Sequence, residues 1–243
     1  MIERRFQWTD STCLVTGIYG FIGTHLCRRL VSMGARVVGL DCLPSTKGTF
    51  FDLQELAKPV TIITGDTRKS AELAPLRRFT FDVVFHLAAQ PIAPLSNENP
   101  SETMEINVMG TANVGQVVAA QREPPVFVFA SSACYYGAST RSPLKEDDPS
   151  VEGEYKYSES KVRAEAEVER MESSYGMPTV RCRFVNIYGP GDRHFSRVIP
   201  KTIRHLIRGE HPSFKRDDGS TILDFMHVDD AVHALLVSAE NGR

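Results

Sequence analysis

A glycine-punctuated turn near the N-terminus is the feature that most constrains what this chain can fold into. A short apolar run at residues 13–15 leads into Gly17, Gly20 and Gly23, and a helical pattern begins at Phe21. In a strand–turn–helix unit, such glycines give a tight turn, room for a phosphate beside the backbone, and close packing of helix on strand. The N–H groups at the start of the helix attract a pyrophosphate. The segment therefore predicts a nucleotide-binding turn, and a plain structural turn of the same spacing is the alternative.

Length and composition predict one large globular core. The 243 residues carry a formal net charge of -2, and 42% of them are hydrophobic, which is ordinary for a globular protein. No basic excess indicates nucleic-acid binding, and no apolar run is long enough to span a bilayer. The start of the chain lacks the apolar core of a signal peptide. The five scattered cysteines form no Cys-x-x-Cys pair, so we expect a cytoplasmic protein with reduced, buried cysteines and no metal site.

An acidic residue follows the glycine turn at the distance expected for a dinucleotide site. Residues 35–40 predict a buried strand that ends at Asp41, about twenty positions after the turn, where the ribose hydroxyls of a dinucleotide are held. A carboxylate there would repel the 2′-phosphate of NADP, so the sequence favours NAD. The alternative is an aspartate that only caps a turn at the strand end.

Strands and helices alternate along the rest of the chain. Apolar runs predict strands over residues 60–64, 82–87, 125–130, 179–185 and, less regularly, 222–226. Helical patterns cover residues 99–121, 155–176, 196–208 and 228–239. This alternation predicts an α/β fold with a doubly wound parallel sheet.

Three polar residues within these elements need partners or roles of their own. Asn99 precedes Pro100 and is expected to cap the helix that follows. His86 lies inside an apolar strand and is expected to be a satisfied structural histidine. Asn107 lies on the apolar stripe of its helix, so its amide needs either a backbone carbonyl or a water of a ligand site.

A tyrosine and a lysine suggest acid–base chemistry. Tyr157 and Lys161 lie one helical turn apart on the predicted helix 155–176 and share a face. A nearby ammonium, together with the charge of an oxidised nicotinamide, lowers the pKa of a tyrosine from about 10. Ser132, at the end of a predicted strand, could hold the same substrate oxygen while an alcohol loses its proton and a hydride. The alternative is a surface Tyr-x-x-x-Lys pair without chemical function.

Six motifs follow one another in a fixed order. They are Gly17-x-x-Gly20-x-x-Gly23, His86-Leu87-Ala88-Ala89, Asn107 ahead of Gly110-Thr111, Ser131-Ser132-x-x-x-Tyr136-Gly137, Tyr157-x-x-x-Lys161, and Asn186-x-Tyr188-Gly189-Pro190. Together they resemble the extended short-chain dehydrogenase/reductase group, in particular the NAD-dependent epimerases and dehydratases of nucleotide sugars. The resemblance implies a Rossmann-type sheet over residues 1–185, which binds NAD and carries the catalytic helix. It also implies a small, apparently truncated C-terminal substrate lobe over 186–243, interleaved with the Rossmann core, and a homodimer formed through the two long helices.

The resemblance further implies roles for particular residues. Ser132, Tyr157 and Lys161 would form the catalytic trio, and Asn186 would contact the substrate together with Ser132. The expected cofactor-binding residues are Gly17, Gly20, Phe21, Ile22, Gly23, Asp41, Asp66, Thr67, Leu87, Ala88, Ala89, Asn107, Tyr157 and Lys161. Among them Asp41 would hold the adenosine ribose, Asp66 would lie near the adenine, and Asn107 would support the lysine through water.

The expected function is that of an NAD-dependent nucleotide-sugar epimerase acting at C4 through a transient 4-keto intermediate. In the related 4,6-dehydratases an Asp-Glu pair follows the catalytic hydroxyl, whereas this chain has Ala133 and Cys134 there. Elimination is therefore disfavoured. The alternatives are an NAD(P)-dependent 4-ketoreductase with the same trio, and a non-catalytic NAD-binding sensor or scaffold.

Two positions depart from the pattern of the family. Tyr19 is bulky for a residue inside the glycine turn. Leu223 replaces an arginine that commonly binds a substrate phosphate, so another cation is needed for a diphosphate. The candidates are Arg193, Arg197, Lys215 and Arg216. We expect Arg197 to bind the substrate, because it lies beside the start of a predicted helix.

Overall fold

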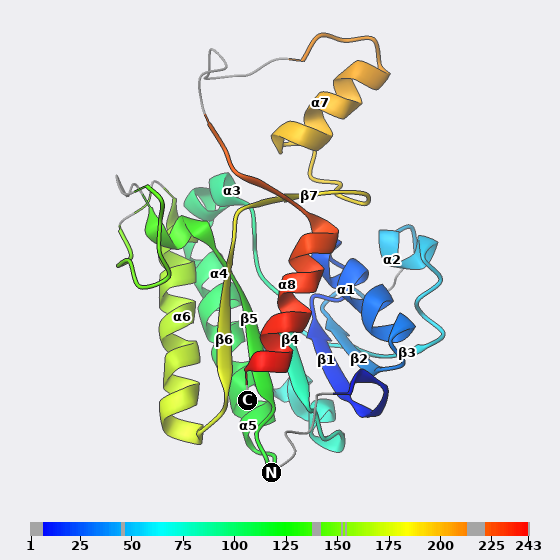
Figure 1. The fold of residues 1–243 in the computed structure, drawn as a ribbon, viewed down its shortest axis with the longest axis vertical. Helices are drawn as coiled ribbons and strands as arrows, with labels where there is room; N and C mark the ends of the chain where they lie inside the picture. The colour runs from blue at the N-terminus through cyan, green and yellow to red at the C-terminus, as the bar shows by residue number, and fades with distance from the viewer. Residues whose placement is uncertain are drawn as a thin grey trace.

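A parallel six-stranded sheet forms the centre of the molecule (Figure 1). The computed structural model describes residues 7–44, 47–137, 142–151, 153, 155–212 and 222–242. The strands lie in the order β3-β2-β1-β4-β5-β6, and every neighbouring pair is parallel. Their bounds are Val60–Thr64 (β3), Arg36–Asp41 (β2), Thr12–Thr16 (β1), Val83–His86 (β4), Val126–Ser132 (β5) and Thr179–Phe184 (β6). This is the order of a Rossmann sheet, so the predicted doubly wound α/β fold is confirmed.

Apolar side chains on both faces explain why these segments form strands. All five residues of β1 are buried. Leu14 packs in the core on one face, while Cys13 and Val15 pack in the core on the other. Parallel strands covered on both faces appear in a sequence as nearly continuous apolar runs. For that reason the sequence predicts all six strands within two residues of their observed bounds.

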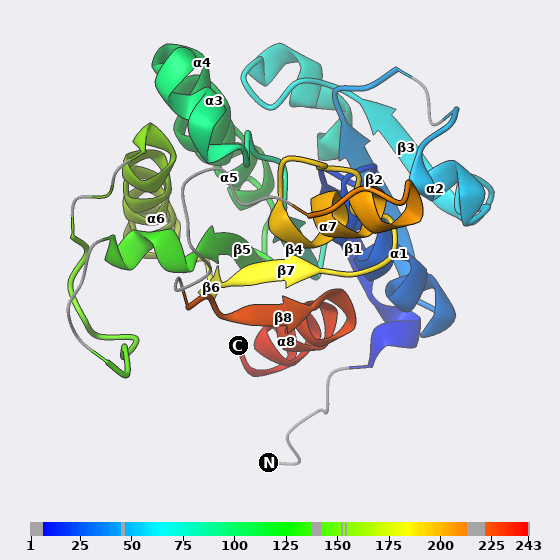
Figure 2. The same ribbon diagram turned by 90° about the horizontal axis from the view of Figure 1, so that it is seen from above.

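Helices cover both faces of the sheet (Figures 1 and 2). On one face lie α1 (Phe21–Ser32) and α8 (Val228–Asn241), and on the other lie α5 (Gly110–Ala119) and α6 (Lys156–Tyr175). The remaining helices are α2 (Phe50–Leu53), α3 (Ala93–Glu98), α4 (Pro100–Met104) and α7 (Val198–Ile207), and 3-10 segments span Trp8–Asp10, Ser70–Arg78 and Ala133–Tyr136. Each buried Leu, Val or Phe side chain between these layers contributes about 1.5–3 kcal/mol of hydrophobic stabilisation.

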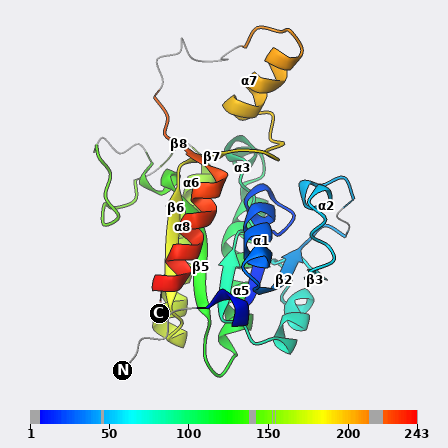
Figure 3. The same cartoon turned by 45° about the vertical axis from the view of Figure 1, so that its right-hand side comes forward.

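A second, two-stranded sheet lies beyond the carboxyl ends of the large sheet (Figure 3). Its strand β7 (Asn186–Tyr188) follows β6 after one residue and pairs in parallel with β8 (Phe225–His227), while α7 lies between them in the chain. Directly after β8 the chain continues into α8, whose Ala231, Leu235 and Ala239 belong to the core on the large sheet. The C-terminal part is thus interleaved with the Rossmann core, and the division at residue 185 stays a prediction.

The helix predicted over residues 99–121 is divided in the structure. It consists of α4, a π-helical turn at Glu105–Met109, and α5. Asn99 precedes α4, but its side chain makes no capping bond. Instead its carbonyl oxygen accepts hydrogen bonds from the backbone N–H and the hydroxyl of Thr103, at 3.1 and 3.0 Å. The predicted side-chain cap is therefore wrong.

The five cysteines are unpaired, but they are not all buried. Cys13 and Cys27 are buried, and Cys134 and Cys182 are partly exposed. Cys42 is exposed, because the chain leaves the sheet one residue earlier. The prediction of uniformly buried cysteines is therefore wrong for Cys42. In the part of the chain that the structure describes, no helix is long and apolar enough to cross a membrane.

His86 joins strands β1 and β4 in the interior. The hydroxyl of Thr16 accepts hydrogen bonds from the backbone N–H groups of Leu87 and Ala88, both at 3.1 Å. That hydroxyl therefore directs its own hydrogen to His86 Nδ1, 2.8 Å away. Because the Thr16 hydroxyl donates to it, Nδ1 of His86 is the acceptor, and the ring hydrogen of the neutral histidine is therefore on Nε2.

The other ring nitrogen of His86 extends the same chain of bonds to helix α5. Nε2–H donates to the Thr111 hydroxyl at 2.9 Å, and that hydroxyl donates to the carbonyl of Asn107 at 2.7 Å. Both ring nitrogens of this 1% exposed histidine thus have partners. The predicted structural histidine is confirmed.

We predict that His86 contributes to the acid sensitivity of the fold. Burial, with a smaller contribution from the charge of Lys161, lowers the pKa of His86 to about 3, against about 6.5 in an unfolded chain. Between these two pKa values the unfolded state therefore binds one more proton than the folded state. The contribution of His86 to the unfolding free energy is fully present above pH ~6.5 and is lost as the pH falls towards ~3. In His86→Gln the unfolding free energy should fall less steeply with decreasing pH over this range, because up to one proton fewer is taken up on unfolding. Urea unfolding at a series of pH values measures the slope.

The same variant should also be less stable at neutral pH, by about 1–3 kcal/mol, because one threonine hydroxyl loses its partner. His233→Gln, on an exposed position of α8, is the matched control and should retain the slope and stability of the wild type. Equal slopes for His86→Gln and the wild type would mean that His86 titrates normally in the folded protein.

Candidate active site

The glycine turn is packed directly against the segment that follows β4. Gly17 has a φ of +68°, and a Cβ atom on it would lie 2.9 Å from the backbone nitrogen of Ala88. A Cβ atom on Gly23 would lie 2.3 Å from the carbonyl oxygen of Gly17. Only glycine fits these two positions without a backbone shift. The turn therefore brings the start of α1 close to the carboxyl end of β4, as a nucleotide site in such a sheet requires.

The start of α1 offers backbone donors to an anion. The first bond from residue i to i−4 in this helix runs from Thr24 N–H to the carbonyl of Gly20, at 3.0 Å. Helix geometry gives the N–H groups of residues 21–23 no such partner within the helix. They lie at the positive end of the helix dipole. Gly20, Phe21, Ile22 and Gly23 are thus arranged as the predicted pyrophosphate site, and they fit a dinucleotide.

Tyr19 is accommodated outside the phosphate-binding surface of the turn. Its side chain is buried, and its ring meets Phe51 of α2 edge-on, with 5.1 Å between the ring centroids. The neighbouring Ile18 fills the space beside Gly39, where a Cβ atom would lie 2.4 Å from the Ile18 Cδ1 atom. The two bulky residues therefore pack into the core and leave the backbone of the turn accessible.

The carboxylate of Asp41 braces the glycine turn. One oxygen accepts a hydrogen bond from Tyr19 N–H at 3.0 Å, and the other accepts one from Leu43 N–H at 3.1 Å. Burial raises the pKa of Asp41, and these backbone bonds act in the opposite direction. The alternative role of Asp41, capping a turn at the strand end, is therefore observed. Its contact with a ribose stays a prediction.

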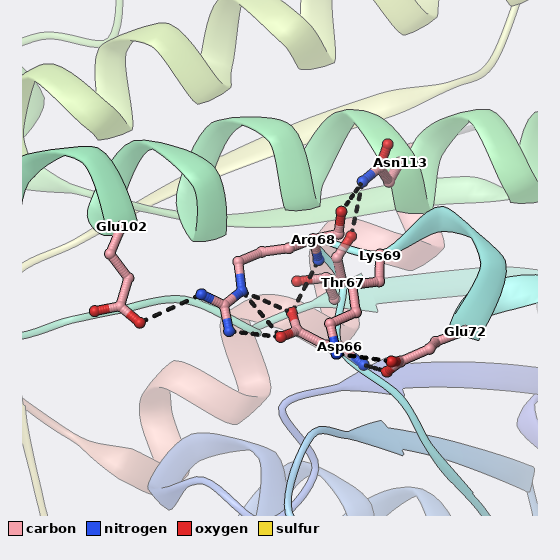
Figure 4. A network of polar contacts seen from close by, with 7 residues as sticks. All are labelled: Asp66, Thr67, Arg68, Lys69, Glu72, Glu102 and Asn113. Atoms are coloured by element: carbon pink, nitrogen blue, oxygen red, sulfur yellow. Dashed lines mark hydrogen bonds and ion pairs between the residues drawn. The ribbon is translucent and has the colours of Figure 1, made fainter.

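Arg68, which sequence reasoning missed, fixes Asp66 at the carboxyl end of β3 (Figure 4). Its Nε and Nη2 donate to one oxygen of Asp66 at 2.9 and 2.6 Å, and its Nη1 lies 3.3 Å from Glu102 of α4. The hydrogen bond from Arg68 lowers the pKa of Asp66. Asn113 of α5 donates to the carbonyl of Thr67 at 2.9 Å. Both predicted residues are thus held in place, and the Asp-x-Arg spacing after a strand was the available signal for Arg68.

Asn107 holds the segment after β4 against α6. Its side-chain oxygen accepts a hydrogen bond from Gln90 N–H at 2.7 Å, and its amide group donates to the carbonyl of Gln90 at 3.2 Å and to the hydroxyl of Ser160 at 2.9 Å. The backbone partner considered from the sequence is therefore confirmed. The residues between this clamp and His86 are Leu87, Ala88 and Ala89, all partly exposed where they would line a cofactor.

The structure brings the three predicted catalytic side chains together. Ser132 ends β5, and its hydroxyl lies near enough to the phenol of Tyr157 to favour the phenolate. The ammonium nitrogen of Lys161 lies 5.8 Å from the ring centroid of Tyr157 and donates to the carbonyl of Ala130 at 2.8 Å. Lys161 is only 4% exposed, so a surface Tyr-Lys pair is excluded. The catalytic role of the trio stays a prediction.

Burial sets the protonation of Tyr157 and Lys161 in the protein alone. It raises the pKa of Tyr157, and the nearby hydroxyl of Ser132 and the charge of Arg197 only partly oppose it. It lowers the pKa of Lys161 to about 8, against the opposing influence of Cys134 and Glu165. The predicted lowering of the tyrosine pKa includes the charge of a bound oxidised nicotinamide, so it stays a prediction. A further positive charge at the site is needed to favour the phenolate.

The predicted substrate residues lie on the small sheet and the segments beside it. Asn186 begins β7, and its amide donates to the carbonyl of Asp224 at 3.1 Å. Leu223 is 49% exposed one residue before that carbonyl. The alternative phosphate ligands Lys215 and Arg216 lie outside the described residues.

Of the described arginines considered for the phosphates, Arg197 has the more suitable place. It precedes α7, and its Nη1 lies 3.4 Å from a carboxylate oxygen of Asp192. Its positive charge acts on the pKa of Tyr157, so it faces the same site. Arg193 instead donates to the carbonyl of Gly48 at 2.7 Å, which links it to the segment before α2.

Comparisons with known proteins agree with this geometry. Residues 13–243 match the sequence profile of the NAD dependent epimerase/dehydratase family. The chain is 30% identical over 237 residues to UDP-glucuronate 4-epimerase 4 of Arabidopsis thaliana, which covers 94% of this chain and 54% of that protein. It is 33% identical over 238 residues to the UDP-N-acetyl-alpha-D-glucosaminuronate decarboxylase of Bacillus cytotoxicus, covering 94% and 71%.

A solved structure has the same fold. Epimerase Mth375 from Methanothermobacter thermautotrophicus superposes with a TM-score of 0.86 at 27% identity, over 96% of this chain and 70% of that one. The chain spans about half the length of the curated 4-epimerase to which it is similar.

We predict that Asp41→Ala weakens NAD binding and narrows the preference against NADP. The variant loses the bond to Tyr19 N–H and the charge that repels a 2′-phosphate. NAD affinity should fall about tenfold, equivalent to about 1.4 kcal/mol. Calorimetric titration of both cofactors into wild type and variant measures the two affinities. Asp230→Ala, at an exposed position of α8, should change neither, and an unaltered preference in Asp41→Ala would locate the ribose contact elsewhere.

Proposed function

The chain belongs to the NAD dependent epimerase/dehydratase family, and from that premise we propose that it is a nucleotide-sugar epimerase acting at C4. The observation that carries the proposal is the cluster of Ser132, Tyr157 and Lys161 at the carboxyl edge of the sheet. A hydroxyl, a phenol and a buried ammonium are the groups needed to take a proton from an alcohol and return it to a ketone. The similarity to a UDP-glucuronate 4-epimerase supports a nucleotide sugar as the substrate.

The thiol after the catalytic serine supports epimerisation over elimination. Elimination from the sugar needs a base for a carbon-bound proton, and a carboxylate would supply it. Ala133 and Cys134 stand there, and burial raises the pKa of the Cys134 thiol. The thiol therefore stays protonated at neutral pH and is a poor base. Oxidation and reduction at C4 need no such base.

The residues of the glycine turn would hold the NAD of this family. The N–H groups at the start of α1 would bind its pyrophosphate, Asp41 would bind its adenosine ribose, and Ala88 and Ala89 would line it. A bound nicotinamide would supply the acceptor, and later the donor, of the hydride of the sugar.

Proton movement in the proposed reaction belongs to the chain's own residues. Tyr157 takes the proton of the C4 hydroxyl on its phenol oxygen and gives it back when the ketone is reduced. Ser132 donates a hydrogen bond to the same substrate oxygen and fixes its place. Lys161, an ammonium at neutral pH with a pKa of about 8, stabilises the phenolate. Inversion requires the keto sugar to present its other face before reduction.

Two further properties rest on the family resemblance and the cysteine pattern. We propose a homodimer formed through the helix pair of α4–α5 and α6, and a cytoplasmic location. Sedimentation of the purified protein measures the first.

We predict that Tyr157→Phe lowers turnover by at least about a hundredfold, which is the low end for the loss of general acid–base help. NAD affinity and fold should be retained, since the ring remains. Conversion of UDP-glucuronate and of UDP-, dTDP-, CDP- and GDP-hexoses, followed by NMR, measures turnover. Tyr155→Phe, just before the same helix, is the matched control and should keep its activity. Near-normal activity in Tyr157→Phe would refute the catalytic assignment.

We predict that Arg197→Ala raises the dissociation constant of the nucleotide sugar about tenfold or more. A charge-assisted contact to the diphosphate, about 1.5–3 kcal/mol, is lost. NAD affinity should not change, because the cofactor phosphates would bind at the glycine turn on another element. Calorimetric titration of NAD-loaded protein with the same sugars measures this constant. Arg208→Ala, exposed at the other end of α7, should bind normally. If the wild type binds none of these sugars, the nucleotide-sugar proposal falls.

A further inference from the structure

A buried ion pair lies directly behind the candidate catalytic cluster. Arg183 of β6 forms a bidentate ion pair with the carboxylate of Glu165 of α6. Its Nε donates to one oxygen at 3.0 Å, and its Nη2 donates to the other at 2.7 Å. Glu165 is 1% exposed, and the Arg183 side chain is 16% exposed. This two-point geometry fixes the plane of the guanidinium as well as its distance.

Arg183 also holds the turn that follows the catalytic serine. Its Nη1 donates to the phenol oxygen of Tyr136 at 2.9 Å and to the carbonyl of Glu146 at 2.8 Å. Its guanidinium carbon lies 3.6 Å from the ring centroid of Tyr135, a cation–π contact. The 3-10 turn Ala133–Tyr136 is therefore fastened to β6 through this one side chain.

Glu165 makes the corresponding contacts on the catalytic side. Its carboxylate accepts a hydrogen bond from the hydroxyl of Ser131, the residue before Ser132. It also lies one helical turn after Lys161 on α6, so the two side chains share a face. The ion pair thus connects the four segments that carry or border the trio: β5, the 3-10 turn, α6 and β6.

Stability alone is a poor reason for such a pair. Removing two charges from water costs several kcal/mol per ion, and well-packed apolar side chains of similar size are often as stabilising. A buried pair that contacts Ser131, next to Ser132, and the 3-10 turn that follows has a more specific use. It supplies fixed geometry and a fixed negative charge beside a buried ammonium.

We propose that Glu165 and Arg183 are positioning residues of this site, which keep Ser132, Tyr157 and Lys161 in register and give Lys161 a buried counter-charge. The catalytic meaning of this inference rests on the proposed function, whereas its electrostatic content does not. Arg183 sets the strength of the counter-charge, because its guanidinium neutralises part of the carboxylate that it binds.

Several charged or titratable groups face Lys161 and bear on its ionisation. Tyr157 and Glu165 face it from α6, Cys134 from the 3-10 turn, and His86 from β4. His86 is neutral over the range in which Lys161 titrates, and Cys134 and Glu165 both raise the pKa of Lys161. Of these groups, Glu165 is the carboxylate, so its removal should have the larger effect at neutral pH.

The test is the pKa of Lys161 in the whole protein, measured by NMR from the ¹³Cε signal of labelled lysine and assigned through Lys161→Arg. Glu165→Gln removes the attraction and leaves the repulsion of Arg183, so it should lower this pKa by about one unit. Arg183→Gln removes the repulsion and should raise it. A merely structural role would loosen the site equally in both variants and move the pKa in one direction.

The chain offers a matched control between the same two elements. Arg181 of β6 and the exposed Glu169 of α6 form a second ion pair, with 3.3 Å between nitrogen and oxygen. Glu169→Gln should leave the Lys161 pKa unchanged. If a single variant fails to fold, the double variant Glu165→Gln/Arg183→Gln leaves no lone buried ion. Its Lys161 pKa should then fall below the wild-type value, because Glu165, one helical turn from Lys161, is the charge of the pair that raises this pKa.

Shifts of opposite sign in the two single variants support the inference. Shifts of the same sign, or a Lys161 pKa in either single variant within about 0.2 units of the wild type, overturn it. The double variant at the wild-type value overturns it as well. The titration needs neither substrate nor turnover, so the failure of every nucleotide sugar in the assays above would leave this result standing.

Discussion

The contact between the glycine turn and the segment after β4 is the constraint on which the rest of the structure depends. A Cβ atom at Gly17 would meet the backbone of Ala88, so these two backbone segments lie in direct contact with no room for a side chain between them. The hydroxyl of Thr16 fastens that approach by accepting two backbone N–H groups, and His86 passes the connection on to α5. Because these polar groups are buried and mutually satisfied, a shift in one strand would leave unpaired groups in the others.

The carboxyl edge of the sheet repeats this arrangement on a larger scale. Asn107 clamps the segment after β4 to α6, and Glu165 with Arg183 clamps α6 to β5 and β6. Buried polar side chains thus connect each of the elements that border the candidate site. A site assembled from several strand ends needs such connections, since each end would otherwise move separately.

Much of the fold follows from the sequence, because its signals are local. Continuous apolar runs predicted the strands, and the glycines predicted the turn whose backbone contacts require them. The division of the helix at Glu105–Met109 was not predictable in this way, because Asn107 finds its partners on segments distant in the sequence. Arg183 was missed for the same reason, since its partner Glu165 lies on another element and a lone arginine carries no sign of it. Arg68 had a local signal, its spacing from Asp66, that was not recognised. The burial that opposes ionisation of Tyr157 was likewise not predictable, because it depends on tertiary packing, whereas the spacing to Lys161 does not.

The small sheet joins the large one through two neighbouring crossings, which tie the predicted C-terminal lobe to the sheet at both ends. The chain enters the lobe from β6 through a single residue before β7, and it leaves through β8, which runs directly into α8. Because β7 and β8 are hydrogen-bonded neighbours, the two crossings lie side by side. The described part of the lobe is thus anchored to the large sheet at both of its ends through one pair of hydrogen-bonded strands. A displacement of one crossing strand would be transmitted to the other through their backbone hydrogen bonds, and through β8 directly to α8.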